Sequence, residues 1–352
     1  MRFPVAAFRA APTALFACVL ALLPVHSASA ADMPQGGLRR DMLSDYAPDP
    51  SPGRTHNEFW TWQFRLNDGL QIQMNMSRVH LGSLKDPVCG SDLAVMGFKG
   101  RNYFVAREYP LRNFTWDPGA GRLEVHNNIW AEGIPPREHR VHFSTSKGGV
   151  DYFLDLTFEH MTPGAVWGDG MFRLAGGEKA SLFFHIPSAR VRGRLAINGD
   201  TIAVRGFGAM DHSRQTQFAT RFMDAGYRYV VTSGRVEAGY FLQKGSRVSG
   251  YGIREENGVL KLLKPEALRI DERTSWGGIS VPRRLDVLLD GRPPVNLQRV
   301  EDRQRTSVLQ ELGSLERMGA RMYLGGEIFG YRGMGRVDDS LPAIYSFTMV
   351  KR

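Results

Sequence analysis

A carboxylic acid and an imidazole stand side by side at Asp211 and His212, in a segment over residues 204–217 that begins as an apolar strand. Histidine titrates near neutral pH, and a neighbouring carboxylate can raise its pKa and fix its tautomer. The pair is therefore the candidate catalytic couple, with one residue acting as acid and the other as base. Because adjacent residues of a strand point to opposite faces, the alternative is that one of them caps the end of a barrel by hydrogen bonding to the backbone.

Polar side chains follow this pair and extend the candidate site. Arg214 and Gln215 are predicted to bind the polar headgroup of a ligand, and the alternative is that they are solvated rim residues. The other histidines are scattered, and the nearest pair, His139 and His142, has no third ligand at the spacing of a metal site. The sequence also lacks a nucleophile elbow, a phosphate-binding loop and a dinucleotide fingerprint. No metal and no cofactor are therefore expected.

Two alternating segments, 59–66 and 70–76, are predicted to form a hairpin that places aromatic side chains on one face. Residues opposed across a hairpin share a face, so the loop length can be tested against the pattern. A two-residue loop at 68–69 mixes apolar and polar residues on each face, whereas a three-residue loop at 67–69 keeps one face apolar. We therefore expect the three-residue loop, with Gly69 in the left-handed conformation. The expected pairs are Leu66 with Leu70, Phe64 with Ile72, Trp62 with Met74, and Trp60 with Met76.

Turn signals recur along the chain and indicate an all-β protein. A two-residue turn at Asn198–Gly199 keeps apolar residues opposite one another. Asn257–Gly258 and Asp290–Gly291 mark further turns, and 39 glycines accompany many short alternating segments. Residues 307–318 carry apolar side chains at roughly helical spacing and are predicted to form either a short helix or a strand.

The aromatic and sulfur-containing side chains of the hairpin are candidates for lining a ligand cavity. A small barrel either fills with side chains or encloses one small ligand. Large aromatic rings and adaptable methionines suit a long apolar ligand, and ordinary core packing is the equal alternative. The candidates in this hairpin are Trp60, Trp62, Phe64, Met74 and Met76.

Residues 1–30 have the pattern of a secretory signal peptide. Two arginines precede or flank an apolar run over 11–23, and the small residues Ala28 and Ala30 mark a cleavage site. We expect cleavage after Ala30 and hence an exported protein, periplasmic or secreted. Residues 31–56 are rich in proline, aspartate, serine and glycine, and they are predicted to form an extended lead-in without a core of its own.

The formal net charge of +9 is carried mostly by arginine. One reading is attraction to anionic polymers or lipid headgroups, which makes an anionic membrane surface an expected peripheral partner. The other reading is a dispersed basic surface. Because no run of five or six like charges occurs, binding to nucleic acid is not expected. Once the leader is removed, Cys89 is the remaining cysteine, so we expect no internal disulfide and a buried, inert thiol.

About 322 residues follow the leader, 352 less 30, which is long for one core and favours two domains. An internal repeat points the same way, since the aromatic strand at residue 59 is echoed about 168 residues later at Tyr227 and in the following strand at Tyr240. We therefore expect one β domain over 57–215 and another over 216–352. Tyr227 and Tyr240 are further ligand-binding candidates.

The order of these landmarks resembles the hydroxyneurosporene synthase (carotenoid 1,2-hydratase)-like family of double-lipocalin proteins, whose relatives include survival-factor-like lipid carriers and lipocalin-like Diels-Alderases. The aromatic strand and turn over 57–69, and the Gly-rich strand with Asp-His over 206–212, match the start and end of the family's first domain. The segments 226–242, 276–282 and 322–336 match its second domain. The resemblance spans nearly all of the mature chain and implies an all-β fold of two consecutive lipocalin-like antiparallel β-barrels.

The resemblance also implies a function, but the sequence lacks residues that the family uses for catalysis. In the carotenoid hydratases a Trp tied to catalysis stands two residues after the His, and here that position is Arg214. The family's downstream acid has no counterpart two residues after Tyr240. A guanidinium beside an alkene disfavours the carbocation that hydration requires. We therefore expect an exported protein that binds or carries an apolar lipid or isoprenoid. The alternative is a hydratase-like lyase or isomerase with Asp211 and His212 as acid and base.

Overall fold

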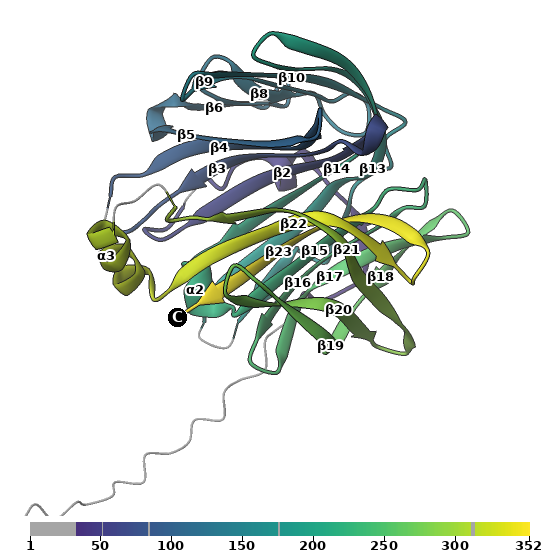
Figure 1. The fold of residues 1–352 in the computed structure, drawn as a ribbon. Helices are drawn as coiled ribbons and strands as arrows, with labels where there is room; N and C mark the ends of the chain where they lie inside the picture. The colour runs from purple at the N-terminus through teal and green to yellow at the C-terminus, as the bar shows by residue number, and fades with distance from the viewer. Residues whose placement is uncertain (1–32, 51, 84, 175–176, 311–313) are drawn as a thin grey trace, which may run out of the picture.

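The computed structural model describes residues 33–50, 52–83, 85–174, 177–310 and 314–352, and the predicted leader lies outside these ranges. Two antiparallel sheets make up most of the described chain (Figure 1). The prediction of an all-β chain is therefore confirmed. No helix in these ranges combines the length and the apolar content needed to cross a bilayer.

The first sheet curves into a nearly closed barrel (Figure 1). Its strands are β1 (Leu38–Arg40), β2 (Asn57–Leu66), β3 (Gln71–Val79), β4 (Val88–Phe98), β5 (Arg101–Pro110), β6 (Phe114–Asp117), β7 (Arg122–Val125), β8 (Ile129–Glu132), β9 (Arg140–Lys147), β10 (Val150–Glu159), β11 (Ala165–Trp167), β12 (Met171–Arg173), β13 (Lys179–Ile197) and β14 (Asp200–Gln215). The main path runs β5-β4-β3-β2-β14-β13-β10-β9-β8-β7-β6. Strands β11 and β12 pair with β13, and β1 pairs with β11.

The second sheet forms a half-barrel with the order β18-β17-β16-β15-β23-β22-β21-β20-β19. Its strands are β15 (Ala225–Val231), β16 (Glu237–Lys244), β17 (Arg247–Glu256), β18 (Val259–Leu263), β19 (Pro265–Trp276), β20 (Ile279–Leu289), β21 (Arg292–Ser307), β22 (Glu327–Val337) and β23 (Leu341–Lys351). Strand β15 pairs with the last strand, β23, just as β2 pairs with β14 in the first sheet. The two sheets therefore share one plan, which confirms the predicted fold of two consecutive lipocalin-like barrels.

Helix is confined to short connections. The α-helices are α1 (Leu43–Tyr46), α2 (Ala219–Phe222) and α3 (Ser314–Leu324), and single 3₁₀ turns occur at η1 (Asn67–Gly69) and η2 (Leu111–Asn113). The sequence predicts either a helix or a strand over residues 307–318. In the structure, β21 ends at Ser307, and α3 begins at Ser314. Residues 311–313 of that segment lie outside the described ranges.

The register of the first hairpin is the predicted one. The ladder pairs Trp60 with Met76 and Trp62 with Met74, and the Leu66 N–H donates to the Leu70 carbonyl at 2.8 Å. Gly69 has the predicted left-handed conformation with φ 71°, and its neighbour Asp68 shares it with φ 57°. The hydrophobic pattern therefore identifies the loop length correctly, because a register shifted by one residue would bring polar residues into the core.

The other predicted turns also form. In the second hairpin, which turns at Asn198 and Gly199, Leu195 pairs with Ile202, as the two-residue turn requires. Residues 257–258 and 290–291 are turns between consecutive strands. Asparagine and glycine tolerate the positive φ that such turns need, and Asn198 has φ 52°.

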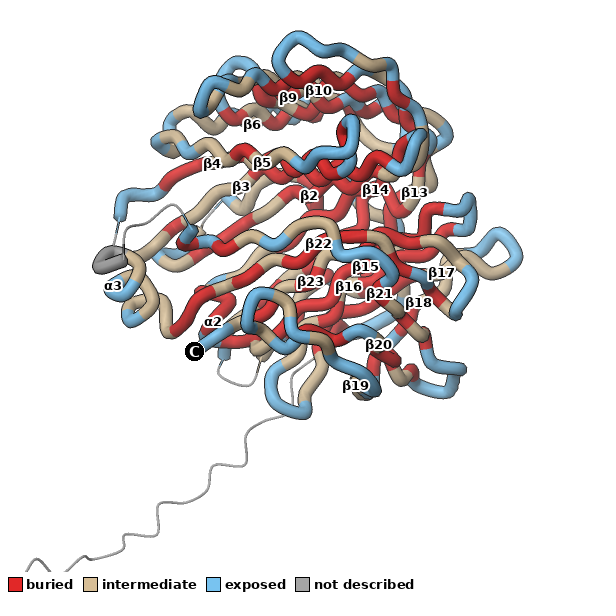
Figure 2. The backbone as a smooth tube through the Cα atoms, in the orientation of Figure 1, coloured by how far each residue is buried: buried red, intermediate tan, exposed pale blue. Residues whose placement is uncertain are grey.

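The two sheets are packed against each other where the chain passes from one to the other. Figure 2 shows buried positions gathered along β13 and β14 of the first sheet and β15 to β17 of the second. All seven residues of β15 are buried, so both faces of that strand are covered. The Tyr251 hydroxyl of β17 donates across the interface to the carbonyl oxygen of Leu182 at 3.1 Å.

The proline-rich lead-in contacts the first barrel along its length. Strand β1 pairs with β11, and helix α1 carries Tyr46 into the first core with 2% of its surface exposed. The Trp60 indole N–H donates to the Tyr46 carbonyl at 3.0 Å. The described part of the lead-in therefore packs against the first barrel through β1 and α1.

Candidate functional site

The predicted site segment is strand β14, and its two candidate catalytic residues face opposite ways. His212 lies opposite Trp60 in the ladder with β2, and Asp211 lies opposite Thr61. The His212 ring stacks on Trp60 inside the first barrel with centroids 4.5 Å apart, whereas Asp211 contacts Arg228 on the second sheet. The alternation of a strand therefore gives the two side chains different partners.

His212 belongs to a buried polar group that we call the Glu58 cluster, which consists of Glu58, His56, Arg78, His212 and Arg214. The Glu58 carboxylate has no exposed surface and accepts hydrogen bonds from Arg214 Nε at 2.9 Å and from Arg78 Nη1 at 3.2 Å. His212 Nε2 lies 2.9 Å from the same carboxylate, and its Nδ1 lies 2.9 Å from the Asp45 carbonyl oxygen. Both ring nitrogens of His212 thus lie within hydrogen-bond distance of protein oxygens.

Opposite charges and hydrogen bonds together determine the protonation of this cluster. Burial alone would raise the pKa of Glu58, but the hydrogen bond with His212, the nearby His56 ring and the charge of Arg214 hold that pKa well below its usual range. Burial lowers the pKa of His212 to about 4, and the hydrogen bond to Glu58 opposes this shift. Since both nitrogens of His212 face oxygen acceptors, hydrogen bonding favours the doubly protonated ring and burial favours the neutral one. The Glu58 cluster is therefore a hydrogen-bonded group in which two guanidinium groups share one carboxylate, and it holds α1 and β2 to β14.

A second buried polar group lies beside the first and includes residues of the lead-in. His185 is the extra residue of a β-bulge, where the register of β13 with β14 shifts between Phe184 and Ile186. Its Nδ1 lies 2.9 Å from Asp41 Oδ2, and the Tyr46 ring stands edge to face with it at 5.2 Å. His185 Nε2 and the Tyr46 hydroxyl are buried without a hydrogen-bond partner in the described ranges. The arrangement has the form of an acid/base site, but 0% of His185 and 2% of Tyr46 are exposed, so the site is sealed.

Asp211 joins the two sheets. Its Oδ1 lies 2.9 Å from Arg228 Nη2 in an ion pair whose N–H group is not aligned for a hydrogen bond. Burial raises the pKa of Asp211, and the Arg228 charge opposes that rise. The Arg228 guanidinium in turn lies over the Tyr240 ring, 4.3 Å from its centroid. These contacts give Asp211 a place in the interface between the sheets.

The predicted ligand-lining residues of the first hairpin pack against aromatic neighbours inside the first barrel. The Trp62 indole N–H donates to His139 Nε2 at 2.9 Å, and Trp60 stacks on Phe114 with centroids 5.6 Å apart. The residues with no exposed surface are Trp60, Trp62, Phe64, Met74 and Met76. Four hollows on the described part of the chain are large enough to give a volume, and none of these five residues lines any of them.

The remaining predicted ligand residues lie between the sheets or in the second core. Arg214, Gln215 and Tyr240 line a hollow of about 20 Å³, which is room for about one water molecule. Tyr227 is buried in the second core, where its hydroxyl donates to Gln243 Oε1 at 3.0 Å. The structure therefore brings three of the predicted residues together, in a space too small for a lipid chain.

A much larger hollow, which we call the inter-sheet groove, lies between the outer face of β3 to β5 and the segment that runs from the end of β21 into α3. Its volume is about 870 Å³, within the range of small-molecule sites. The apolar lining includes Val79, Leu81, Phe104, Ala106, Leu309 and Leu324. Basic side chains in the lining are Lys85, Arg107, Lys147 and Arg332, and the acidic ones are Asp92 and Glu108.

Asp92 brings a carboxyl group to this groove, and sequence reasoning missed it. Leu93 and Val95 face the first core, so alternation along β4 turns Asp92 outward. Asn75 Nδ2 donates to Asp92 Oδ1 at 2.8 Å, and Arg332 Nη2 lies 3.9 Å from it. The surrounding protein raises the pKa of this carboxyl although Arg332 and Asn75 oppose the rise, while 27% of the side chain stays exposed. The sequence signal that could have identified Asp92 is a charged residue within an otherwise mostly apolar strand.

Cys89 also lines the inter-sheet groove. The thiol is free and buried, as predicted, and burial raises its pKa to about 11. A protonated thiol is a poor nucleophile and metal ligand. Within the described ranges, no group of three or more His, Cys, Asp or Glu side chains could hold a metal ion.

Comparisons with known proteins give likeness of fold without likeness of sequence. No family model matches the chain, and no curated protein matches it. An AttH candidate of Nitrosomonas europaea is 16% identical with a TM-score of 0.58, over 94% of this chain and 99% of that one. Kievitone hydratase from Nectria haematococca is 13% identical with a TM-score of 0.51, over 88% and 91%. CghA, solved with Sch210972, is 15% identical with a TM-score of 0.56, over 90% and 98%.

Identities this low show a shared fold and nothing finer. The alignments cover nearly the whole of each chain, so both barrels and their order are common to these proteins. The neighbours include a hydratase, which agrees with the hydratase-like side of the sequence resemblance at the level of fold. The closer resemblance to hydroxyneurosporene synthase remains a prediction.

Proposed function

We propose that this protein binds an amphipathic, mostly apolar small molecule in the inter-sheet groove. The observation that carries the proposal is the groove itself, about 870 Å³ in volume and lined by apolar side chains from the first sheet on one side and from the segment after β21 and α3 on the other. Burial of apolar ligand surface there is favourable at about 25 cal/mol per Å². A lipid or an isoprenoid, the ligand class expected from the sequence, has the required shape and polarity.

The polar edge of the groove favours a ligand with a negatively charged or strongly polar end. Four basic side chains and two carboxylates line it. Glu108 is paired with Lys85, and Asp92 lies near Arg332. Arg107 Nε instead donates to the Thr145 hydroxyl at 3.0 Å, which leaves its charge without a carboxylate partner within the described ranges. A carboxylate or phosphate on the ligand would supply that partner.

The test is titration of the purified mature protein with a fluorescent fatty acid. Ala106, on β5, lines the groove, and Ala106→Trp places an indole in the space that the ligand would occupy. We expect the variant to bind the probe at least about tenfold more weakly than the wild type, a loss of about 1.4 kcal/mol.

The matched control is Ala267→Trp on β19, which adds the same indole to a half-buried position outside the groove. It should bind the probe as the wild type does. Equal affinity of Ala106→Trp and Ala267→Trp, or no uptake of the probe by the wild type, would show that the groove is not the binding site.

A second candidate function, an enzyme that adds water to or removes it from an isoprenoid or polyene, is favoured by Asp92. This carboxyl opens onto the groove, Asn75 orients it, and its raised pKa allows it to keep its proton at higher pH than an exposed aspartate does. A protonated carboxyl beside an apolar ligand can act as a general acid. In the other version of this enzyme proposal, Asp211 and His212 act as the acid and base, as the sequence predicts.

Mass spectrometry of an alkene or enone incubated with the protein separates these versions, because hydration adds the mass of one water. If Asp92 is the acid, Asp92→Asn loses turnover and keeps the probe affinity, whereas Asp211→Asn and His212→Ala keep turnover in proportion to the folded fraction. The reverse pattern would assign the chemistry to the β14 pair. Absence of any product from the wild type would leave binding as the whole function.

A further inference from the structure

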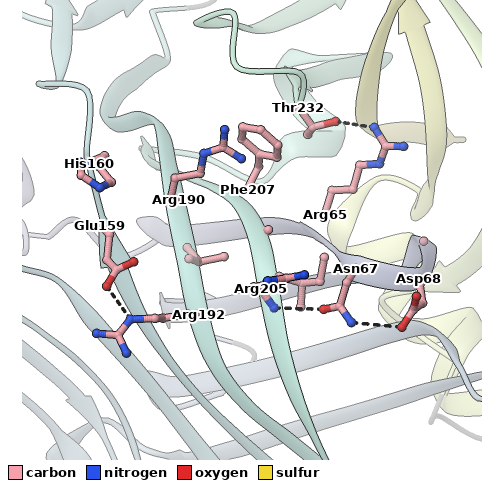
Figure 3. A pocket seen from close by; sticks show the side chains of 14 residues that line it. Arg65, Asn67, Asp68, Glu159, His160, Arg190, Arg192, Arg205, Phe207 and Thr232 are labelled. Carbon is pink, nitrogen blue, oxygen red and sulfur yellow. Dashed lines mark hydrogen bonds and ion pairs between the residues drawn. The ribbon is translucent and has the colours of Figure 1, made fainter.

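A second groove on the first barrel is lined by arginines (Figure 3). It has a volume of about 780 Å³ and lies where the turn over residues 67–69 meets β13 and β14. An adjoining hollow of about 520 Å³ shares Asn67, Arg192 and Arg205 with it and extends to Arg194. We call the two hollows together the arginine groove. It shares no lining residue with the inter-sheet groove.

Three of its arginines come from the alternation of a single strand. Arg190, Arg192 and Arg194 on β13 are exposed, and the residues between them are Val191, which is buried, and Gly193, which is not exposed. Successive side chains of a strand point to opposite faces, so the three guanidinium groups share the outer face of the barrel.

A fourth arginine faces this row directly. In the ladder between β13 and β14, Arg205 is the partner of Arg192. Like charges placed directly opposite each other destabilise a sheet. Glu159 forms an ion pair with Arg192 and offsets one of the two charges, but Arg205 has no carboxylate at ion-pair distance in the described ranges.

The other arginines of the groove are likewise held without a counter-charge. The Arg190 guanidinium lies over the Phe207 ring, 4.2 Å from its centroid, and Arg65 Nη1 donates to the Thr232 hydroxyl at 3.2 Å. Five arginines therefore face two carboxylates in the lining, an excess of three positive charges. The arginines are Arg65, Arg190, Arg192, Arg194 and Arg205, and the carboxylates are Glu159 and Asp68.

This arrangement matches an array of phosphate groups. A guanidinium offers planar paired donors that fit phosphate oxygens, and phosphate is therefore a preferred partner of arginine. The arginines spread over two adjoining hollows on one face, so several phosphates can be bound at once, as a layer of lipid headgroups presents them. We infer that the arginine groove binds the phosphate groups of an anionic membrane surface.

The inference is tested by co-sedimentation with two kinds of vesicle, phosphatidylcholine alone and phosphatidylcholine mixed with phosphatidylglycerol. The wild type should sediment with the mixed vesicles only, and added salt should release it because screening weakens exposed charge contacts. The triple variant Arg190→Gln, Arg194→Gln and Arg205→Gln should bind the mixed vesicles about 100-fold more weakly, since each basic side chain near an anionic surface contributes about fivefold. Arg192 is left in place because it is paired with Glu159.

The matched control removes three exposed arginines that lie elsewhere: Arg101, Arg112 and Arg137. Changed together to Gln, they give the same net charge as the groove variant, and vesicle affinity should stay within about threefold of the wild type because charges beyond the Debye length are screened. Urea unfolding establishes that both variants are folded. If the groove variant fails that check, the single change Arg194→Gln replaces it, with an expected loss of about fivefold.

Two outcomes would overturn the inference. Equal losses in the groove and control variants would show that vesicle binding depends on net charge and not on the groove. Calorimetric binding of inorganic pyrophosphate by the wild type, without sedimentation on mixed vesicles, would instead make the groove a site for a small soluble anion. Neither outcome bears on the fatty-acid titration of the inter-sheet groove, because the two grooves have no residue in common.

Discussion

The interior of the first barrel and the inter-sheet groove are two apolar regions of one molecule: large rings pack against one another in the first, and the second is a hollow. Inside the barrel, Trp60 and Trp62 are fully buried against other rings, and the Glu58 cluster occupies the same interior. The inter-sheet groove lies on the opposite face of β3 to β5 and keeps about 870 Å³ open. The proposed binding site therefore lies outside the barrel and not within it.

The difference follows from how each surface is covered. The inward side chains of one barrel pack as a single core, in which large rings leave little space. The outer face of β3 to β5 is covered by α3 and the end of β21, which are anchored by a few polar contacts instead of a continuous core. One of them is the hydrogen bond from the Tyr323 hydroxyl to the Leu81 carbonyl at 2.9 Å. Another is the pair of ion pairs that Arg317 and Arg321 make with buried Glu327. The hydrogen bond holds α3 to the first barrel, and the ion pairs hold α3 to β22.

The largest effect on the filled region is expected from Glu58→Gln. The change removes a buried negative charge and leaves Arg78 and Arg214 without their carboxylate, which costs about 3–5 kcal/mol for a buried ion pair. Urea unfolding monitored by tryptophan fluorescence measures the loss. The control is Glu272→Gln, which breaks an exposed pair with Arg283 and should cost less than about 1 kcal/mol. Equal losses in the two variants would mean that the Glu58 cluster does not hold the barrel together.

The second largest effect is expected in the pH dependence of the free energy of unfolding, and His139 is the residue that causes it. Burial lowers the pKa of His139 to about 4, and its ring accepts a hydrogen bond from Trp62 in the neutral form. The unfolded chain takes up that proton near pH 6.5. Stability from this residue is therefore complete above about pH 6.5 and is lost as the pH falls toward 4, by at most about 3 kcal/mol.

The measurement compares the free energy of unfolding of the wild type and of His139→Gln between pH 7 and pH 4. The wild type should lose more stability than the variant over this window, because glutamine does not titrate. Parallel pH profiles would show that His139 has an ordinary pKa and that water reaches the barrel interior.

A smaller effect is expected from Trp62→Phe. The smaller ring leaves a cavity and deprives His139 Nε2 of its donor, and together these should cost about 1–3 kcal/mol. The fatty-acid affinity should not change, because Trp62 does not line the inter-sheet groove. Stronger probe binding by the variant would place the ligand inside the barrel, in the space that the indole had filled.

The sequence predicts the elements well because their pattern is local. The pairing of Trp62 with Met74 follows from alternation on both sides of Gly69, and the Asn198–Gly199 turn follows from the conformations those residues allow. Alternation also anticipates that Asp211 and His212 face different ways, which the contacts of Arg228 and Glu58 show.

The groove could not be predicted in this way, because its walls are brought together from distant parts of the chain. Asp92 and Arg332 lie 3.9 Å apart in space and are separated by 240 positions in sequence, 332 less 92. Likewise, Asp41 and Tyr46 stand in a proline-rich stretch that reads as a linker, and they join the barrel through distant partners such as His185 at a bulge and Trp60. Whether an apolar face is packed or left open depends on the surface that covers it, and no short pattern encodes that surface.

The two regions can be compared directly in a crystal of the protein grown with a brominated long-chain fatty acid. Anomalous scattering locates the bromine without reference to the fold. We predict a bromine peak in the inter-sheet groove, in contact with Phe104 and Leu309. A peak inside the first barrel beside Trp62, or no ordered peak at saturating ligand, would contradict the proposal that the groove between the sheets is the binding site.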